Sequence, residues 1–137
     1  MANLSADANF PIQNQSALVP YPIDTTKTYY KGQLLQTDGS GNAIPVTVGG
    51  STSYKILGRL YDLCDDGLTC VVQEGDLFMN LAATTTPTAA TSGSKVYAYS
   101  DNELSTTSTA GACAGIFLRI DDSTSLGVVR CNLAANV

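Results

Sequence analysis

Hydrophobic and polar side chains alternate over short stretches along most of the chain, and turn-forming residues separate these stretches. The clearest case is 76–81, in which Leu77, Met79 and Leu81 alternate with Phe78 and Asn80. A period of two places successive side chains on opposite faces of a β-strand, so this pattern predicts a strand. No stretch of ten or more residues shows the 3.6-residue period of an amphipathic helix.

The same reasoning predicts about eight to ten short strands, and therefore an all-β fold: a small antiparallel barrel or sandwich. The expected strands are 33–37, 43–48, 54–63, 69–73, 76–81, 95–100, 103–106, 112–120 and 126–133. Glu74-Gly75 is interpreted as a break between two of them, and 121–125 as the turn of a hairpin. We expect a loop over 82–94 and one short helical turn near 105–112. The strand 54–63 has apolar residues on both faces, which is typical of a central or interface strand.

The first 26 residues differ from the rest of the chain. They contain Pro11, Pro20 and Pro22, and proline favours extended backbone. We expect 1–26 to form an extended N-terminal arm, followed by the barrel or sandwich domain over 27–137. Apolar residues on such an arm indicate that it lies along a surface, its own or that of a partner. The candidates for partner binding are Phe10, Ile12, Val19 and Tyr21.

Composition and charge narrow the range of functions. The chain has 137 residues, 44% of them hydrophobic and 14% charged, with a net charge of −5. These values suit one folded domain. The acidic balance argues against binding to nucleic-acid phosphates, and no segment has the length and hydrophobicity of a membrane span. The N-terminal residues lack the pattern of a secretory signal, so we expect synthesis in the cytoplasm.

The sequence contains no histidine, the commonest general base and metal ligand. We therefore expect no enzymatic activity, no cofactor and no metal. The alternative is a small carboxylate-based hydrolase that uses Asp62, Asp65 or Glu74. Because acidic residues in turns are more often turn formers on a solvated rim, the structural interpretation is favoured.

The sequence is compatible with more than one chemical state of the four cysteines: disulfides, metal ligands or free thiols. Cys64 and Cys70 bracket a predicted hairpin tip, and Cys113 and Cys131 lie on the two strands of the last hairpin. Either pair is a candidate disulfide, whereas the spacing is unlike that of a structural zinc site. In a protein that lacks a secretory signal, buried thiols are favoured over disulfides.

Three arginines lie within apolar strands. An arginine in such a position usually pairs with a carboxylate, in the core or at an interface. The candidates for an interface between subunits are Arg59, Arg119 and Arg130, together with Tyr61. The alternative is that these arginines end at a solvated face of the sheet.

The order of these segments over about 27–133 resembles small bacteriophage capsid decoration proteins, also called cement or head-stabilising proteins, of the compact β-barrel type. The shared scheme is a Gly-x-x-Val-Tyr strand, a short turn, a Thr-Thr step, a Gly-x-aliphatic strand and a last strand rich in Val, Arg and Leu. Residues 75–81 resemble the central strand of that family. The residues that match are Gly93, Val96, Tyr97, Thr106, Thr107, Gly115, Ile116, Val128, Val129, Arg130 and Leu133.

This resemblance implies a structural virion protein. It would bind the major capsid protein on the outer capsid surface, as a homotrimer at three-fold or pseudo-three-fold positions, and stabilise contacts between coat subunits. The resemblance does not cover the arm or the loop at 82–94. The alternative is another phage tail, fibre or surface β-module involved in attachment.

Overall fold

The computed structural model describes residues 3–8, 17–48, 54–83 and 85–131. These residues form nine strands in one connected sheet and a single 3-10 turn, which confirms the all-β class. The elements are β1 (Ala17–Pro22), β2 (Leu34–Thr37), β3 (Ala43–Pro45), β4 (Ile56–Leu63), β5 (Thr69–Leu81), η1 (Ala89–Thr91), β6 (Lys95–Ala98), β7 (Glu103–Ser105), β8 (Cys113–Ile120) and β9 (Gly127–Cys131).

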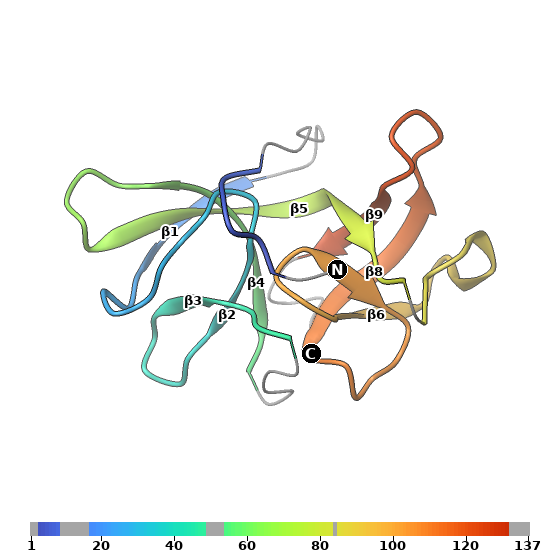
Figure 1. Ribbon diagram of the computed structural model, residues 1–137, viewed down its shortest axis with the longest axis horizontal. Coiled ribbons are helices and arrows are strands. Elements are labelled where there is room, and N and C mark those ends of the chain that lie inside the picture. Colours follow the sequence, from blue (N-terminus) through green and yellow to red (C-terminus); the bar gives the residue numbers. More distant parts are fainter. Residues whose placement is uncertain (1–2, 9–16, 49–53, 84, 132–137) are drawn as a thin grey trace.

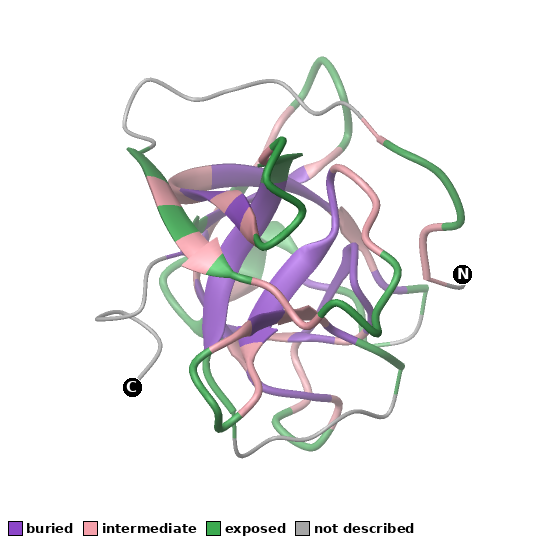
Figure 2. Ribbon diagram, turned by 90° about the vertical axis from the view of Figure 1, so that its left-hand side faces the viewer, coloured by how far each residue is buried: buried purple, intermediate pink, exposed green. Residues whose placement is uncertain are grey.

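Five strands close into a barrel (Figure 1). β5 pairs in parallel with β7, and the antiparallel pairs β7–β6, β6–β8, β8–β9 and β9–β5 complete the ring. Most residues of these strands are buried, as the purple ribbon in Figure 2 shows. The barrel interior is filled by a cluster that includes Leu77, Met79, Val96, Leu104, Phe117 and Val129. We call this cluster the barrel core.

The remaining strands form an outer sheet with the order β1-β5-β4-β2-β3. An isolated bridge between Ile23 and Ala43 connects the end of β1 to β3, so this sheet curls back on itself. The curl encloses a second, smaller cluster, which we call the outer core: Leu35, Ala43, Leu57, Leu60, Cys70 and Val72. β4 lies between β2 and β5, which confirms the central position expected for 54–63.

The expected break at Glu74-Gly75 is wrong, because 69–81 forms one strand of 13 residues. As far as Glu74, β5 pairs with β1 and β4; from Gly75 onward it pairs with β9 and then β7. Gly75 has φ +112°, a conformation that residues with side chains rarely adopt. The glycine therefore marks the point where the strand passes from the outer sheet to the barrel. Figure 1 shows β5 running from β1 to β9.

The helical turn expected near 105–112 is also wrong. That segment consists of turns after β7, and the 3-10 turn lies instead at 89–91, within the expected loop. The backbone of 111–112 runs close against β6, where Ala98 N–H donates to the carbonyl of Ala112 over 2.9 Å. A Cβ on Gly111 would collide with the carbonyl oxygen of Ala98. This close packing on β6 leaves the chain no room to coil.

The structure does not confirm a separate N-terminal arm. Residues 17–22 form β1, which pairs with β5 in an antiparallel register from Ala17 opposite Glu74 to Pro22 opposite Thr69. Residues 3–8 also bond to the rest of the protein, as described below. Phe10 and Ile12 lie outside the described residues.

The prolines of β1 affect its outer edge. Ile23 N–H donates to the carbonyl of Leu68, on the side of β5, over 3.0 Å. Because backbone nitrogens alternate in direction along a strand, those of Pro20 and Pro22 face away from β5. Proline has no N–H to donate, so this edge is poorly suited to the addition of another strand.

Gly115 supplies a test of the barrel. In β8 it has φ +140°, and an added Cβ would collide with the carbonyl oxygen of Arg130 on β9. We expect Gly115→Ala to lower the free energy of unfolding by about 3 kcal/mol, measured by urea denaturation. Gly41→Ala is the control, because Gly41 also has positive φ but open space around it, and should cost about 1 kcal/mol. Equal losses in the two variants would contradict the packing described.

Candidate functional site

The four residues predicted for an interface do not form one surface. Tyr61 is exposed on β4, with 42% of its surface accessible. Arg119 and Arg130 are exposed on β8 and β9. Arg59, in contrast, is 3% exposed.

Arg59 lies in β4 opposite Leu34 of β2 and Gln73 of β5. Its Nη2 atom lies 2.6 Å from the sulfur of Met79, which belongs to the barrel core. Burial lowers the pKa of Arg59 to about 9, although its charge remains favoured at neutral pH. The structure therefore places Arg59 inside the protein, between the outer sheet and the barrel.

The two exposed arginines form ion pairs within the protein. Arg130 lies directly opposite Asp76 across β9 and β5, and its Nε and Nη2 atoms donate to the two carboxylate oxygens over 2.9 and 3.2 Å. This bidentate bond raises the pKa of Arg130. Arg119 donates to Asp121 over 3.2 Å. The pairing expected for arginines in strands is present at both positions.

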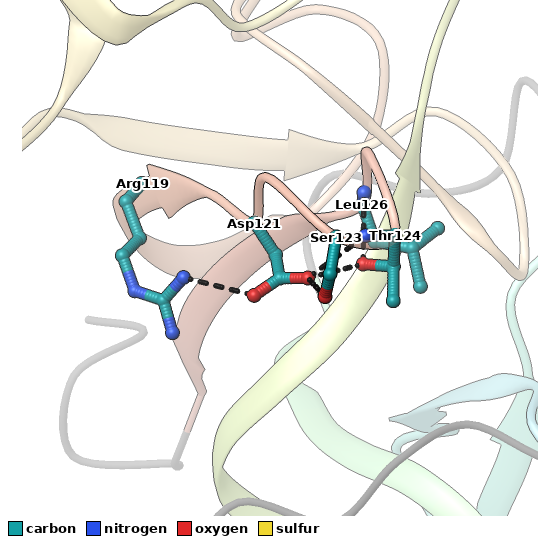
Figure 3. A network of polar contacts seen from close by, with 5 residues as sticks. All are labelled: Arg119, Asp121, Ser123, Thr124 and Leu126. Carbon is teal, nitrogen blue, oxygen red and sulfur yellow. Dashed lines mark hydrogen bonds and ion pairs between the residues drawn. The ribbon is translucent and has the colours of Figure 1, made fainter.

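Asp121 organises the turn between β8 and β9 (Figure 3). One carboxylate oxygen accepts from the hydroxyls of Ser123 and Thr124 over 2.8 and 2.7 Å, and from the Thr124 N–H over 3.0 Å. These bonds, assisted by Arg119, hold the pKa of Asp121 well below its usual range. The expected hairpin is confirmed, and its turn is fixed by this carboxylate.

A buried carboxylate attaches the N-terminal residues to the fold. Asp101 is fully buried in the turn between β6 and β7. It accepts hydrogen bonds from Leu4 N–H over 2.9 Å, from the Gln33 amide over 2.9 Å and from the Asn102 amide over 2.7 Å. The Asp101 N–H in turn donates to the side chain of Asn3 over 3.2 Å.

A second attachment lies further along the same segment. Ala8 N–H donates to the carbonyl of Lys31 over 2.7 Å, and Lys31 N–H donates to the Asp7 carboxylate over 2.8 Å. Residues 3–8 therefore form a strap across the segment that leads into β2. Neither contact has a periodic signal in the sequence, because the partners are 24 positions apart for Asp7 and Lys31 and 97 positions apart for Leu4 and Asp101.

All four cysteines carry thiols in this structure. Cys70 belongs to the outer core, and burial raises its pKa to about 11. Cys64 N–H donates to the carbonyl of Thr69, the neighbour of Cys70, over 3.0 Å, and the proximity of Cys64 also raises the pKa of Cys70.

The acidic residues of the hydrolase alternative lie at different points of the β4–β5 hairpin. Asp62 is opposite Val71 and forms an ion pair with Lys31 at 3.6 Å. Asp65 lies in the turn, and Glu74 lies opposite Ala17 of β1. In the described parts of the chain, no group of three or more Cys, Asp or Glu side chains could hold a metal ion. Nor does any helix there have the length and apolar character needed to cross a membrane.

The structure brings together an apolar surface that the sequence analysis did not identify. Tyr21, Cys70 and Leu63 lie in register across β1, β5 and β4, and Leu68 adjoins Ile23 through the backbone bond given above. We define the hairpin-tip surface as Tyr21, Ile23, Tyr29, Leu63 and Leu68. Leu63 and Leu68 are 41% and 61% exposed. The other three are partly buried against the outer core.

A shallow hollow of about 260 Å³ lies beside this surface, lined by Asp7, Tyr29, Lys31, Leu60, Asp62 and Leu63. Tyr29 is held in place because its hydroxyl donates to the carbonyl of Ala43 over 2.6 Å and accepts from Asp24 N–H over 3.0 Å. One feature of the sequence could have indicated the hairpin-tip surface. Leu63 and Leu68 lie on either side of Asp65-Asp66-Gly67, and residues next to such a turn are normally polar.

Asp101→Asn tests the strap. We expect the loss of this acceptor to lower the free energy of unfolding by about 1–3 kcal/mol and to abolish protection of the Leu4 amide from hydrogen exchange. Leu4→Pro removes the donor of the same bond. If the bond fixes the strap, the double variant should be less destabilised than the sum of the two single variants. Additive losses would contradict this assignment.

Asp121→Asn tests the turn between β8 and β9. Because the folded pKa of Asp121 lies below its unfolded value, its charge stabilises the fold above about pH 4, and this contribution is lost as the pH falls further. The difference in stability between wild type and Asp121→Asn should therefore be constant from pH 7 to pH 5 and shrink below pH 4. Asp122→Asn, on the same turn, should change stability little. A difference that does not depend on pH would refute the role given to the charge.

Comparison of this chain with protein-family models, with curated proteins and with solved structures gives no significant match. The observations that bear on function are therefore the strand order, the barrel and the surfaces described above.

Proposed function

We propose that this protein is a decoration protein of a bacteriophage capsid. In this proposal it binds the major capsid protein on the outer surface of the virion and stabilises contacts between coat subunits. It acts as a homotrimer at three-fold or pseudo-three-fold positions, without catalytic activity and without a cofactor.

The proposal is supported by where the residues that match decoration proteins lie in the folded structure. Gly93 lies in the turn before β6, Val96 and Tyr97 lie in β6, and Thr106-Thr107 follow β7 directly. Gly115-Ile116 lie in β8, and 128–130 lie in β9. The resembling residues thus lie in three of the five barrel strands and directly after a fourth, and 75–81 lies in the fifth, β5. The scheme read from the sequence corresponds to one closed structural unit rather than to scattered strands.

The architecture is also suited to a protein that bears mechanical load. The barrel has no free edge along its ring, and the prolines of β1 reduce the donors at an outer edge, so self-association into open sheets is disfavoured. Two separate cores are connected by one continuous strand. If three copies attach together, the second and third attachments become nearly intramolecular, which can raise the overall affinity by about 10²–10⁴.

The test is co-sedimentation of the purified protein with mature, decoration-stripped capsids of its source virus. We expect saturable pelleting at a copy number that matches the three-fold positions, and sedimentation of the protein as a trimer. Unexpanded capsids and purified tails of the same virus are the controls. Absence of pelleting with expanded capsids would overturn the proposal, and pelleting with tails instead would support an attachment module.

A further inference from the structure

We propose that the hairpin-tip surface is the site by which this protein docks on its partner, and that the complementary surface of the partner is apolar and bordered by lysine or arginine. This inference rests on the proposed function and names the contact within it. It is carried by the exposure of the tip, by its rigidity and by the charges around it.

The apolar groups of the tip project beyond the outer core rather than into it. Leu63 and Tyr21 flank Cys70 in register, so all three side chains lie on the face of the sheet that covers the outer core. At the tip that face continues past the core, and Leu68 is the most exposed of the large hydrophobic residues described. Burial of such side chains against a partner is the main source of binding energy at protein interfaces.

The tip is ordered before any partner binds. The Asp66 carboxylate accepts from the N–H of Leu68 and from the N–H and hydroxyl of Thr69 over 2.8–3.1 Å. Gly67 N–H donates to the carbonyl of Cys64, which closes the turn. A surface that is already ordered loses little conformational entropy on binding.

The charges around the tip are predominantly negative. Five aspartates border it: Asp24 follows Ile23, Asp62 precedes Leu63, Asp65 and Asp66 lie in the turn before Leu68, and Asp7 lines the hollow. Lys31 lines the same hollow, and its ammonium group pairs with Asp62. Hydrogen bonds hold the pKa values of Asp24 and Asp66 below their usual range, so both are charged at neutral pH.

This charge pattern identifies the occupant. A second copy of the chain docked through the same surface would bring two sets of aspartates together, and like charges at an interface cost affinity. A basic and apolar surface on a different protein would pair with the aspartates and bury the leucines. Under the proposed function, that protein is the coat subunit, and contacts between copies of this chain lie elsewhere.

The experiment measures binding of wild type and four variants to the stripped capsids. Leu68→Ser removes an apolar contact, and Val48→Ser is its control, because Val48 is 51% exposed at a different site. Asp65→Lys reverses a charge at the tip, and Asp122→Lys reverses one on the turn between β8 and β9. All four positions are exposed, so the fold should be retained, which circular dichroism checks.

We expect Leu68→Ser to weaken binding about tenfold or more. Asp65→Lys should weaken it by a similar factor at low salt and by less at high salt, because salt screens exposed charges. Both controls should bind as wild type does. If wild type binds and the tip variants bind equally well, the docking surface is wrong while the proposed function stands. If wild type itself does not bind, the proposed function and the partner named here both fall.

Discussion

The structure depends on the continuity of β5. Its first half is paired on both sides in the outer sheet, and its second half closes the barrel. Each core is small, and a small core alone gives limited stability. Because both cores draw side chains from this strand, Val72 on one side of Gly75 and Leu77 on the other, neither sheet can separate without breaking it. The positive φ of Gly75 allows the change of sheet without a break in the backbone.

Polar groups buried between the elements add specificity to this arrangement. Arg59 reaches from β4 to Met79 of the barrel core, and Asp101 joins the turn after β6 to Gln33 and to the N-terminal strap. The hydrogen bonds that the buried Asp101 carboxylate accepts from Leu4 and Gln33 favour one placement of the strap relative to β2 and to the turn after β6.

The fold class, most strand positions and the last hairpin could be predicted from the sequence, because alternation and turn residues are local signals. The errors have physical causes. Glu74-Gly75 looks like a turn, yet glycine at this position serves a change of sheet. Strict alternation along 112–120 predicts that Phe117 and Arg119 share one face of the strand, but a bulge between them leaves Phe117 buried and Arg119 exposed. Arg59 and Asp101 are charged residues whose burial depends on partners far away in the chain. Leu63 and Leu68 are visible in the sequence only as leucines on either side of a polar turn, and their common exposure beside Tyr21 is a property of the tertiary structure.

In the proposed function, the closed barrel carries a rigid hairpin with an acidic border, and this hairpin docks on a basic, apolar surface of a capsid. The most direct measurement is a cryo-electron microscopy reconstruction of the capsid with the protein bound. The account predicts density for this fold at three-fold or pseudo-three-fold positions, with the tip between β4 and β5 against the coat subunit. Density that meets the coat through the turn between β8 and β9, or no density on the capsid at all, would contradict it.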